Sequence, residues 1–254
     1  LLSRGLGDVY KRQNMNKEKL LYENSKHALQ SDNIIAITNR HLCNRPFMEQ
    51  LERVCKLHPH AIVLREKDMP EAEYLSLARD VIALCKKYDV QCMLHSFINV
   101  AMELEHPYIH LPLPILEAYV KKNVSGNIST GMSKSTDNYQ QFFKVIGTSV
   151  HSVEDAIKAE QLGATYMTAG HIFATDCKKG LPPRGLDFLK NVCDAVGIPV
   201  YAIGGINIAS NDDSTASDAP STYDAMPDIS VPRLADVMKC GAAGGCIMSG
   251  MMRV

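Results

Sequence analysis

Two stretches of the chain combine residue types that bind a phosphate group. The first, residues 170–185, is a predicted loop that carries Thr175, Lys178 and further polar side chains. The second follows the apolar residues 199–203 and consists of Gly204 and Gly205. Because glycine has no Cβ, paired glycines let backbone N–H groups approach an anion closely. Loops of this kind bind phosphate at the strand ends of α/β barrels, so a small phosphorylated substrate is the first hypothesis.

Further residues that can bind anions or move protons follow the other predicted strands. In an α/β barrel the C-terminal ends of the strands carry the catalytic side chains. In chain order, the residues at these ends are Arg65, Glu66, Lys67, His95, Ser96, His110, His151, His171, Thr175, Asp176, Lys178, Gly204, Gly205, Met248, Ser249 and Gly250. Cations and imidazoles outnumber carboxylates in this set. That balance favours an anionic substrate and a reaction that transfers protons.

Short apolar strands alternate with amphipathic helices along the chain. This alternation is typical of a parallel sheet that is buried on both faces. The predicted strands are residues 33–38, 61–65, 90–94, 108–111, 144–148, 165–169, 200–203 and 245–248. The predicted helices are residues 46–58, a helix that starts at Pro70, and residues 99–104, 153–161, 186–195 and 232–240. Eight strands predict an α/β fold of the (β/α)8 TIM barrel type, whose last helix we expect this chain to lack.

A single barrel domain is expected over residues 15–254, since such barrels often have ~250 residues. Residues 1–14 show no helical or strand period and no apolar signal-peptide core, and we expect a non-native or disordered leader there. Segments near 123–137 and 210–228 are rich in small and polar residues and are predicted to be loop insertions. The second could be a lid or an unstructured insertion.

The composition is ordinary for a globular protein, with 46% hydrophobic and 22% charged residues among 254. A formal net charge of −1 gives no reason to expect nucleic acid or an anionic membrane as a partner. No apolar run approaches the ~20 residues of a membrane span. The eight cysteines form no C-x-x-C pair and are predicted to be reduced core residues of a cytoplasmic protein. The sequence leaves open whether the chain forms a homo-oligomer.

Four segments together resemble one enzyme superfamily. They are residues 62–67 (IVLREK), 147–152 (GTSVHS), 170–178 (GHIFATDCK) and 202–206 (AIGGI). This pattern is similar to the thiamine phosphate synthase superfamily, and it is most like the thiazole tautomerase branch. The resemblance runs from about Asn33 to Gly250, interrupted by the two insertions. The long motif at residues 170–178 is specific, whereas a glycine pair alone would be weak evidence.

The two branches need different residues. In the synthases, the resemblance implies that Mg²⁺ neutralises a pyrophosphate leaving group, held by an Asn-Asp pair after strand three and a His-Leu-Gly-Gln-x-Asp pattern after strand four. Here those positions are His95-Ser96 and His110 to Ile115, and Val63 replaces a family glutamine. Mg²⁺ prefers oxygen ligands, usually one or two carboxylates plus phosphate. We therefore expect no metal and no cofactor, and Mg²⁺ only if the synthase alternative holds.

The tautomerase resemblance implies conversion of a dearomatised thiazole carboxylate phosphate into the aromatic thiazole. His151 is the expected catalytic proton carrier, because imidazole can both accept and donate a proton near neutral pH. Backbone N–H groups of the glycine pair and of the turn at Met248-Ser249, with the start of a following helix, would bind the phosphate. The expected substrate-binding residues are Arg65, Lys67, His110, Thr175, Lys178, Gly204, Gly205, Met248 and Ser249.

Simpler interpretations of the same residues remain open. His151 could be a water-facing residue at the start of a helix, and Arg65, Glu66 and Lys67 could form a self-neutralising rim of salt bridges. His171 could be a structural hydrogen-bonding residue, and Cys177 could serve packing or line the substrate pocket, since tautomerisation needs no nucleophile. Three functions therefore stay in competition: the isomerase, an Mg²⁺-dependent thiamine phosphate synthase, and a non-catalytic barrel that binds a thiazole or thiamine phosphate.

Overall fold

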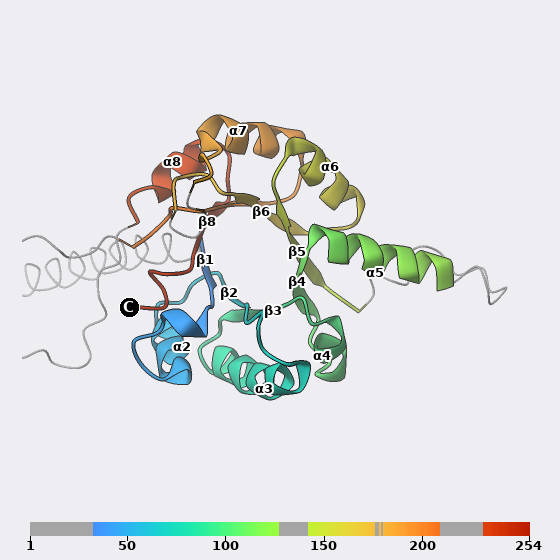
Figure 1. Cartoon of the computed structure of the whole chain (residues 1–254), viewed down its shortest axis with the longest axis vertical. Helices are drawn as coiled ribbons and strands as arrows, with labels where there is room; N and C mark the ends of the chain where they lie inside the picture. The colour runs from blue at the N-terminus through green and yellow to red at the C-terminus, as the bar shows by residue number, and fades with distance from the viewer. Residues whose placement is uncertain (1–32, 127–141, 176–177, 179, 209–230) are drawn as a thin grey trace, which may run out of the picture.

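Eight parallel strands close into a barrel around the centre of the molecule. The computed structural model describes residues 33–126, 142–175, 178, 180–208 and 231–254. Each strand pairs with its neighbours in chain order, and β1 closes the barrel against β8. Figure 1 shows the helices arranged around these strands. The strands are β1 (Ile34–Ile37), β2 (Ala61–Leu64), β3 (Gln91–His95), β4 (Tyr108–Pro112), β5 (Val145–Val150), β6 (Tyr166–Gly170), β7 (Val200–Ile203) and β8 (Gly244–Ile247).

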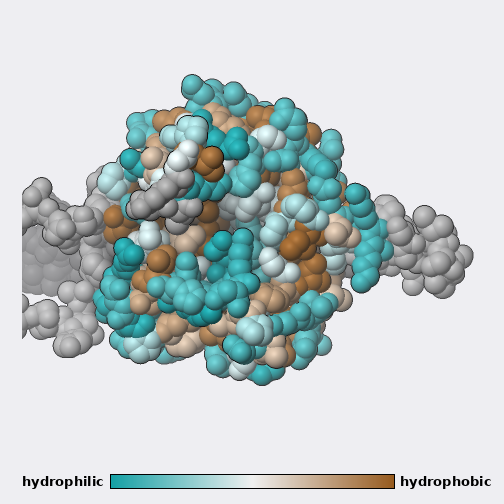
Figure 2. All heavy atoms as spheres, viewed as in Figure 1, coloured by the Kyte–Doolittle hydropathy of each residue, from teal (hydrophilic) through white to brown (hydrophobic). Residues whose placement is uncertain are grey.

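Helices alternate with the strands and bury an apolar stripe against them. They are a 3-10 turn η1 (Arg40–Leu42), α2 (Phe47–Lys56), α3 (Glu71–Lys87), α4 (Ile98–Glu103), α5 (Leu113–Gly126), α6 (Val153–Gln161), α7 (Gly185–Ala195) and α8 (Leu234–Lys239). The larger core lies between helices and strands. On the face that Figure 2 shows, hydrophilic residues are frequent along the outer edge, with hydrophobic residues between them. None of the helices in the described part of the chain is long and apolar enough to cross a membrane.

A second, smaller core fills the inside of the barrel. Its members include Ile35, Val63, Met93 and Cys246, together with the ring of Tyr166. This ring needs a glycine on the neighbouring strand, because a Cβ at Gly147 would collide with it. The barrel interior is therefore packed with side chains, and the chemistry is confined to the strand ends.

The predicted eight-stranded barrel is confirmed, but one helix was missed. Two prolines, Pro112 and Pro114, are unfavourable inside a helix. The helix α5 nevertheless begins at Leu113, so that Pro114 lies in its first turn, where the missing N–H costs little. Residues 123–126, assigned above to an insertion, belong to α5. The remainder of that insertion, the segment 210–228 and the leader 1–14 lie outside the described residues.

Candidate active site at the mouth of the barrel

The residues after the C-terminal ends of the strands form the mouth of the barrel. His151 follows β5, and its Nδ1 lies 2.9 Å from the carbonyl oxygen of Gly170 at the end of β6. A carbonyl oxygen can only accept, so Nδ1 carries the proton and the neutral ring has its lone pair on Nε2. The residue is exposed. His151 thus presents a proton-accepting nitrogen at the mouth.

The local fold around His151 is set by the start of α6. Ser152 caps the helix by accepting a hydrogen bond of 3.0 Å from the backbone N–H of Asp155. The Asp155 carboxylate in turn accepts the backbone N–H of His151 at 3.3 Å. His151 therefore lies beside a capping serine, as the simpler interpretation expects. Its side chain is nevertheless held by the hydrogen bond to the end of β6.

His110 lies below the mouth, inside the barrel. It is only 4% exposed, its Nδ1 is 2.9 Å from the Tyr166 hydroxyl and its Nε2 is 2.9 Å from the Ser149 hydroxyl, which also bonds Thr168. Burial, with the nearby charges of Arg65 and Lys67, lowers the pKa of His110 to about 3. Both ring nitrogens are already occupied. His110 is thus a buried, neutral ring with both nitrogens in contact with protein hydroxyls, and its contact with substrate stays a prediction.

His95, the last residue of β3, stacks on this buried ring. The two imidazole centroids are 5.6 Å apart with 14° between the planes. The Nδ1 of His95 is 2.8 Å from the Ser96 hydroxyl, and its backbone N–H donates to the Tyr74 hydroxyl at 3.0 Å. Burial is the main cause that lowers the pKa of His95, with His110 and the nearby cations adding to it. His95 is therefore a neutral ring held in a fixed orientation.

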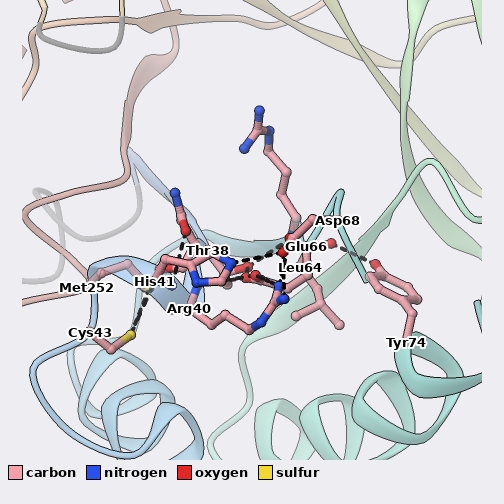
Figure 3. Close-up of polar contacts among 11 residues, drawn as sticks. Thr38, Arg40, His41, Cys43, Leu64, Glu66, Asp68, Tyr74 and Met252 are labelled. Carbon is pink, nitrogen blue, oxygen red and sulfur yellow. Dashed lines mark hydrogen bonds and ion pairs between the residues drawn. The ribbon is translucent and has the colours of Figure 1, made fainter. Parts of the chain in front are cut away.

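The carboxylates at the β1–β2 rim are bound to an arginine that the sequence analysis missed. The Arg40 guanidinium donates to Glu66 at 3.0 Å and to both carboxylate oxygens of Asp68, at 2.8 and 2.6 Å (Figure 3). Thr38 donates to the buried Glu66 at 2.7 Å, and His41 contacts Asp68 at 2.9 Å. The interpretation that Arg65, Glu66 and Lys67 neutralise one another is therefore wrong, because the Glu66 carboxylate pairs with Arg40.

Arg65 and Lys67 are left without a carboxylate partner among the described residues. The backbone N–H of Arg65 donates to Thr38 Oγ1 at 2.9 Å, which anchors the residue at the rim. Lys67 has much exposed surface, yet desolvation of its ammonium, with the neighbouring Arg65 charge, lowers its pKa. Two like charges thus lie near each other at the mouth with no counterion in the described part of the chain.

The loops after β7 and β8 offer backbone donors. Gly204 and Gly205 have φ values of 100° and 69°, and any Cβ there would press on the loop after β6. Within the described residues, the N–H groups of Gly205 and Ser249 donate to no acceptor, while the Ser249 hydroxyl bonds Asn207 at 3.2 Å. These N–H groups are suited to an anion. After β8, residues 249–253 form turns, so the helix expected to add its dipole is not among the described elements.

Arg233 braces this glycine pair and was also missed. Its guanidinium donates to the Gly205 carbonyl at 2.6 Å and lies 4.5 Å above the ring centroid of Phe173. It thereby joins the loop after β6 to the loop after β7. Arg233 lies 28 residues beyond Gly205, so no local spacing in the sequence indicates this contact.

The loop after β6 is described only in part. The backbone N–H of Lys178 donates to the Thr175 carbonyl at 3.1 Å, which places both in one turn beside β6. Asp176, Cys177 and Lys179 lie outside the described residues. His171 is 6% exposed; its ring Nε2 lies 3.4 Å from the Leu181 carbonyl oxygen, and its own carbonyl accepts the backbone N–H of Arg184 at 3.0 Å. Met248 packs against the inner core, so its contribution to the mouth would be its backbone.

The donor set does not fit a magnesium ion. Among the described residues, no group of three His, Cys, Asp or Glu side chains is arranged to hold a metal. Mg²⁺ needs carboxylate or phosphate oxygens. Glu66 and Asp68, the carboxylates at the end of β2, already bind a guanidinium, and the chain has Ser96 and Ile115 at the two positions where the family pattern has aspartates.

The fold and the mouth define an α/β barrel whose mouth carries imidazoles and cations, a set of side chains suited to an anionic small molecule. A family model described as thiamine monophosphate synthase matches residues 34–223. The chain is 35% identical over 173 residues to a putative thiamine-phosphate synthase 2 of Aquifex aeolicus, covering 68% of this chain and 84% of that protein. It is 29% identical over 174 residues to the thiamine-phosphate synthase of Pyrococcus furiosus, covering 68% and 75%.

A solved structure agrees with these relatives. Thiamine phosphate pyrophosphorylase from Pyrococcus furiosus matches with a TM-score of 0.62 and 26% identity over 89% of each chain. The chain belongs to the thiamine monophosphate synthase family. The superfamily expected from the sequence is thus confirmed, while the names of these relatives favour the synthase alternative over the tautomerase branch.

Proposed function

We propose that this chain is a thiazole tautomerase-like isomerase, which aromatises the tautomer of a thiazole carboxylate phosphate by proton transfer through His151. The observation that carries the proposal is the 2.9 Å contact between His151 Nδ1 and the Gly170 carbonyl. That contact sets the tautomer in which Nε2 is the base. Tautomerisation needs a proton taken from one atom and returned at another, with no net loss of atoms or electrons, so one imidazole suffices.

Anion binding would complete the site. The N–H groups of Gly205 and Ser249, which have no acceptor among the described residues, are suited to the phosphate together with Lys178. Arg65 and Lys67 supply positive charge at another part of the mouth. Thr175 in the loop after β6 and the backbone of Met248 after β8 remain proposed contacts with the substrate. No group in this set has to lose or gain an electron, and none has to hold a metal.

The second candidate is a thiamine-phosphate synthase, and the names of the relatives favour it. That reaction joins a pyrimidine diphosphate to thiazole phosphate and expels pyrophosphate, whose charge Mg²⁺ neutralises. Glu66 and Asp68 both accept hydrogen bonds from Arg40, so these carboxylates are not free to bind Mg²⁺, which argues against the synthase. A third candidate is a barrel that binds the same phosphates without turnover.

Turnover of the tautomer with and without EDTA separates these candidates. We expect aromatisation, followed by ultraviolet absorbance, to be unchanged by EDTA and lost in His151→Ala. His60→Ala is the matched control, since His60 is also exposed but precedes β2 at the other end of the barrel. Condensation of the pyrimidine diphosphate with thiazole phosphate, stopped by EDTA, would establish the synthase. Tight binding of the aromatic product with no turnover of either substrate would leave the non-catalytic barrel.

A further inference from the structure

A row of hydrogen-bonded polar side chains crosses the inside of the barrel beneath the mouth. The Tyr166 hydroxyl lies 2.9 Å from Nδ1 of His110, and Nε2 of the same ring lies 2.9 Å from the Ser149 hydroxyl. The Thr168 hydroxyl lies 3.0 Å from Ser149, with which it is in register on the neighbouring strand. The row therefore runs from the inner core, to which Tyr166 belongs, to the end of β5.

The barrel holds Tyr166 in one place. Gly147 is opposite Tyr166 on β5 and leaves the space that the ring fills, since a Cβ there would collide with it. The ring also packs edge-on against Tyr201, with 6.0 Å between the centroids. Tyr166 is 7% exposed, and among the described residues its hydroxyl has no hydrogen-bond partner other than His110. A phenylalanine would fill the same space, so the hydroxyl calls for an explanation of its own.

Only one arrangement of protons leaves no buried hydroxyl of this row without an acceptor. The Tyr166 O–H has to donate to Nδ1 of His110. The His110 ring is neutral, because burial lowers its pKa to about 3, so its one proton is on Nε2 and donates to the Ser149 oxygen. Thr168 is 2% exposed, and its hydroxyl also has Ser149 as its one partner in the described part of the chain, so it donates there as well.

These two donors fill both lone pairs of the Ser149 oxygen. The Ser149 O–H therefore donates neither to His110 nor to Thr168, and its proton is left for an acceptor outside the row. Ser149 is half-buried while the other three residues are buried, so an acceptor can approach it from the mouth. Ser149 also lies two residues before His151, and side chains with this spacing point to the same side of a strand. The donor thus faces the region of the proposed proton carrier.

We propose that Tyr166 is a positioning residue: through His110 it directs the Ser149 hydroxyl as a donor to a ring nitrogen of a heterocyclic phosphate. The inference rests on the proposed function for the identity of the heterocycle, whereas the direction of the hydrogen bonds does not depend on it. The arrangement also selects by chemical class. An atom with a lone pair can bind here, and an N–H group cannot, because the Ser149 oxygen has no lone pair left to accept it.

The binding of thiazole phosphate and of inorganic phosphate separates this role from a structural one. We expect Tyr166→Phe to weaken the binding of thiazole phosphate by about three- to tenfold, the scale of one neutral hydrogen bond, and to leave the affinity for inorganic phosphate unchanged. Calorimetry measures both. Tyr201→Phe is the matched control, because Tyr201 belongs to the same inner core but its hydroxyl has no hydrogen bond among the described residues. Equal losses in the two variants, or a parallel loss with inorganic phosphate, would overturn the proposal.

A double variant shows whether Tyr166 acts through Ser149. Ser149→Ala removes the donor, so we expect Tyr166→Phe to cause no further loss of affinity for thiazole phosphate in that background. Additive losses would mean that the two hydroxyls act separately, and the positioning role would then be wrong.

Nitrogen-15 spectra of the histidines test the direction of the hydrogen bonds without any substrate. The His110 signals, identified by their loss in His110→Gln, should show the proton on Nε2, which is the opposite tautomer from that of His151. Tyr166→Phe should shift the Nδ1 signal of His110, and Tyr201→Phe should not. A proton on Nδ1 of His110 would overturn the proposal. The expected spectra and binding losses in a chain that does not turn over the thiazole tautomer would keep the directed donor and refute the proposed isomerase.

Discussion

The Nδ1 atom of His151 donates to the carbonyl oxygen of Gly170 across 2.9 Å, which links the end of β5 to the end of β6. The contact selects one of the two neutral tautomers. It also holds the ring plane relative to the loop after β6, where Lys178 lies. A base that is positioned before the substrate binds loses little entropy when it acts, so this contact would prepare His151 for the proposed proton transfer.

His151→Asn should abolish most turnover and leave ligand binding intact. Asparagine can still donate to the Gly170 carbonyl, but its side chain offers no basic nitrogen. We expect kcat to fall by about 10²- to 10⁴-fold, the usual contribution of a general acid–base group, while the affinity for the aromatic product changes little. Ultraviolet assays give kcat, and calorimetry gives the affinity. Loss of binding in parallel with kcat would show that His151 holds the substrate and does not act on it.

The sequence predicts the barrel and the strand-end position of His151, but not which side chains meet. The strands are short apolar runs, so their number can be counted and their ends located within a residue or two. Arg40 lies in a one-turn 3-10 helix and reaches a carboxylate 26 residues away, a contact set by the register of β1 on β2. The sequence does not assign His110 to the interior either, because its place near the end of β4 fits a side chain at the mouth as well as one inside the barrel.

Gly205→Ala should destabilise the fold and weaken phosphate binding. Its φ of 69° is unfavourable for alanine, and the new Cβ would lie 2.5 Å from the Ala174 carbonyl oxygen. We expect a loss of about 2–4 kcal/mol from strain and overpacking together, measured by urea unfolding. Gly180→Ala is the control, because φ is 82° but no atom lies within 4 Å. It should cost only the strain, about 1 kcal/mol. Equal costs would remove close packing as the reason for Gly205.

Arg40→Met should destabilise the chain far more than Asp68→Asn. Removing the guanidinium leaves Glu66, whose side chain is 1% exposed, without its cation, and we expect a loss of about 3 kcal/mol. Asp68 is 57% exposed, so its neutralisation changes a solvated pair and should have a much smaller effect. Urea unfolding at pH 7 measures both. The double variant Arg40→Met, Glu66→Gln should recover part of the lost unfolding free energy, because no buried charge is then left unpaired. If it recovers none, Arg40 stabilises the chain through packing and not through this ion pair.

Arg233→Met should weaken phosphate binding with little change in unfolding free energy. The exposed guanidinium holds the Gly205 carbonyl at 2.6 Å, so its loss lets the donor loop move before the ligand arrives. We expect about a tenfold lower affinity for thiazole phosphate, the scale of one charge-assisted hydrogen bond. Arg184→Met serves for comparison, since Arg184 overlies Phe188 at 5.2 Å and has no side-chain hydrogen bond within the described residues. If both variants lose affinity equally, the loss of positive charge explains the weaker binding, and the contact between Arg233 and the Gly205 carbonyl does not.

Stability should decrease as the pH falls from about 6.5 towards 3. His110 has a folded-state pKa of about 3, and the pKa of His95 is lowered as well, whereas an unfolded imidazole titrates near ~6.5. Between these values the unfolded chain binds more protons than the folded one, so the free energy of unfolding rises with pH across the window. Each fully buried imidazole contributes up to about 1.4 kcal/mol per pH unit.

Urea unfolding between pH 7.5 and 4.5 measures this slope. In His110→Gln the glutamine amide can still bond Tyr166 or Ser149, but one titrating group is gone. The slope should therefore decrease by the contribution of one proton, even if the variant is less stable at every pH. The slope should also decrease in His106→Gln, because burial lowers the pKa of His106 too. An unchanged slope in His110→Gln would mean that folding does not lower the pKa of this ring, and the neutral stacked pair beneath the mouth would then be wrong.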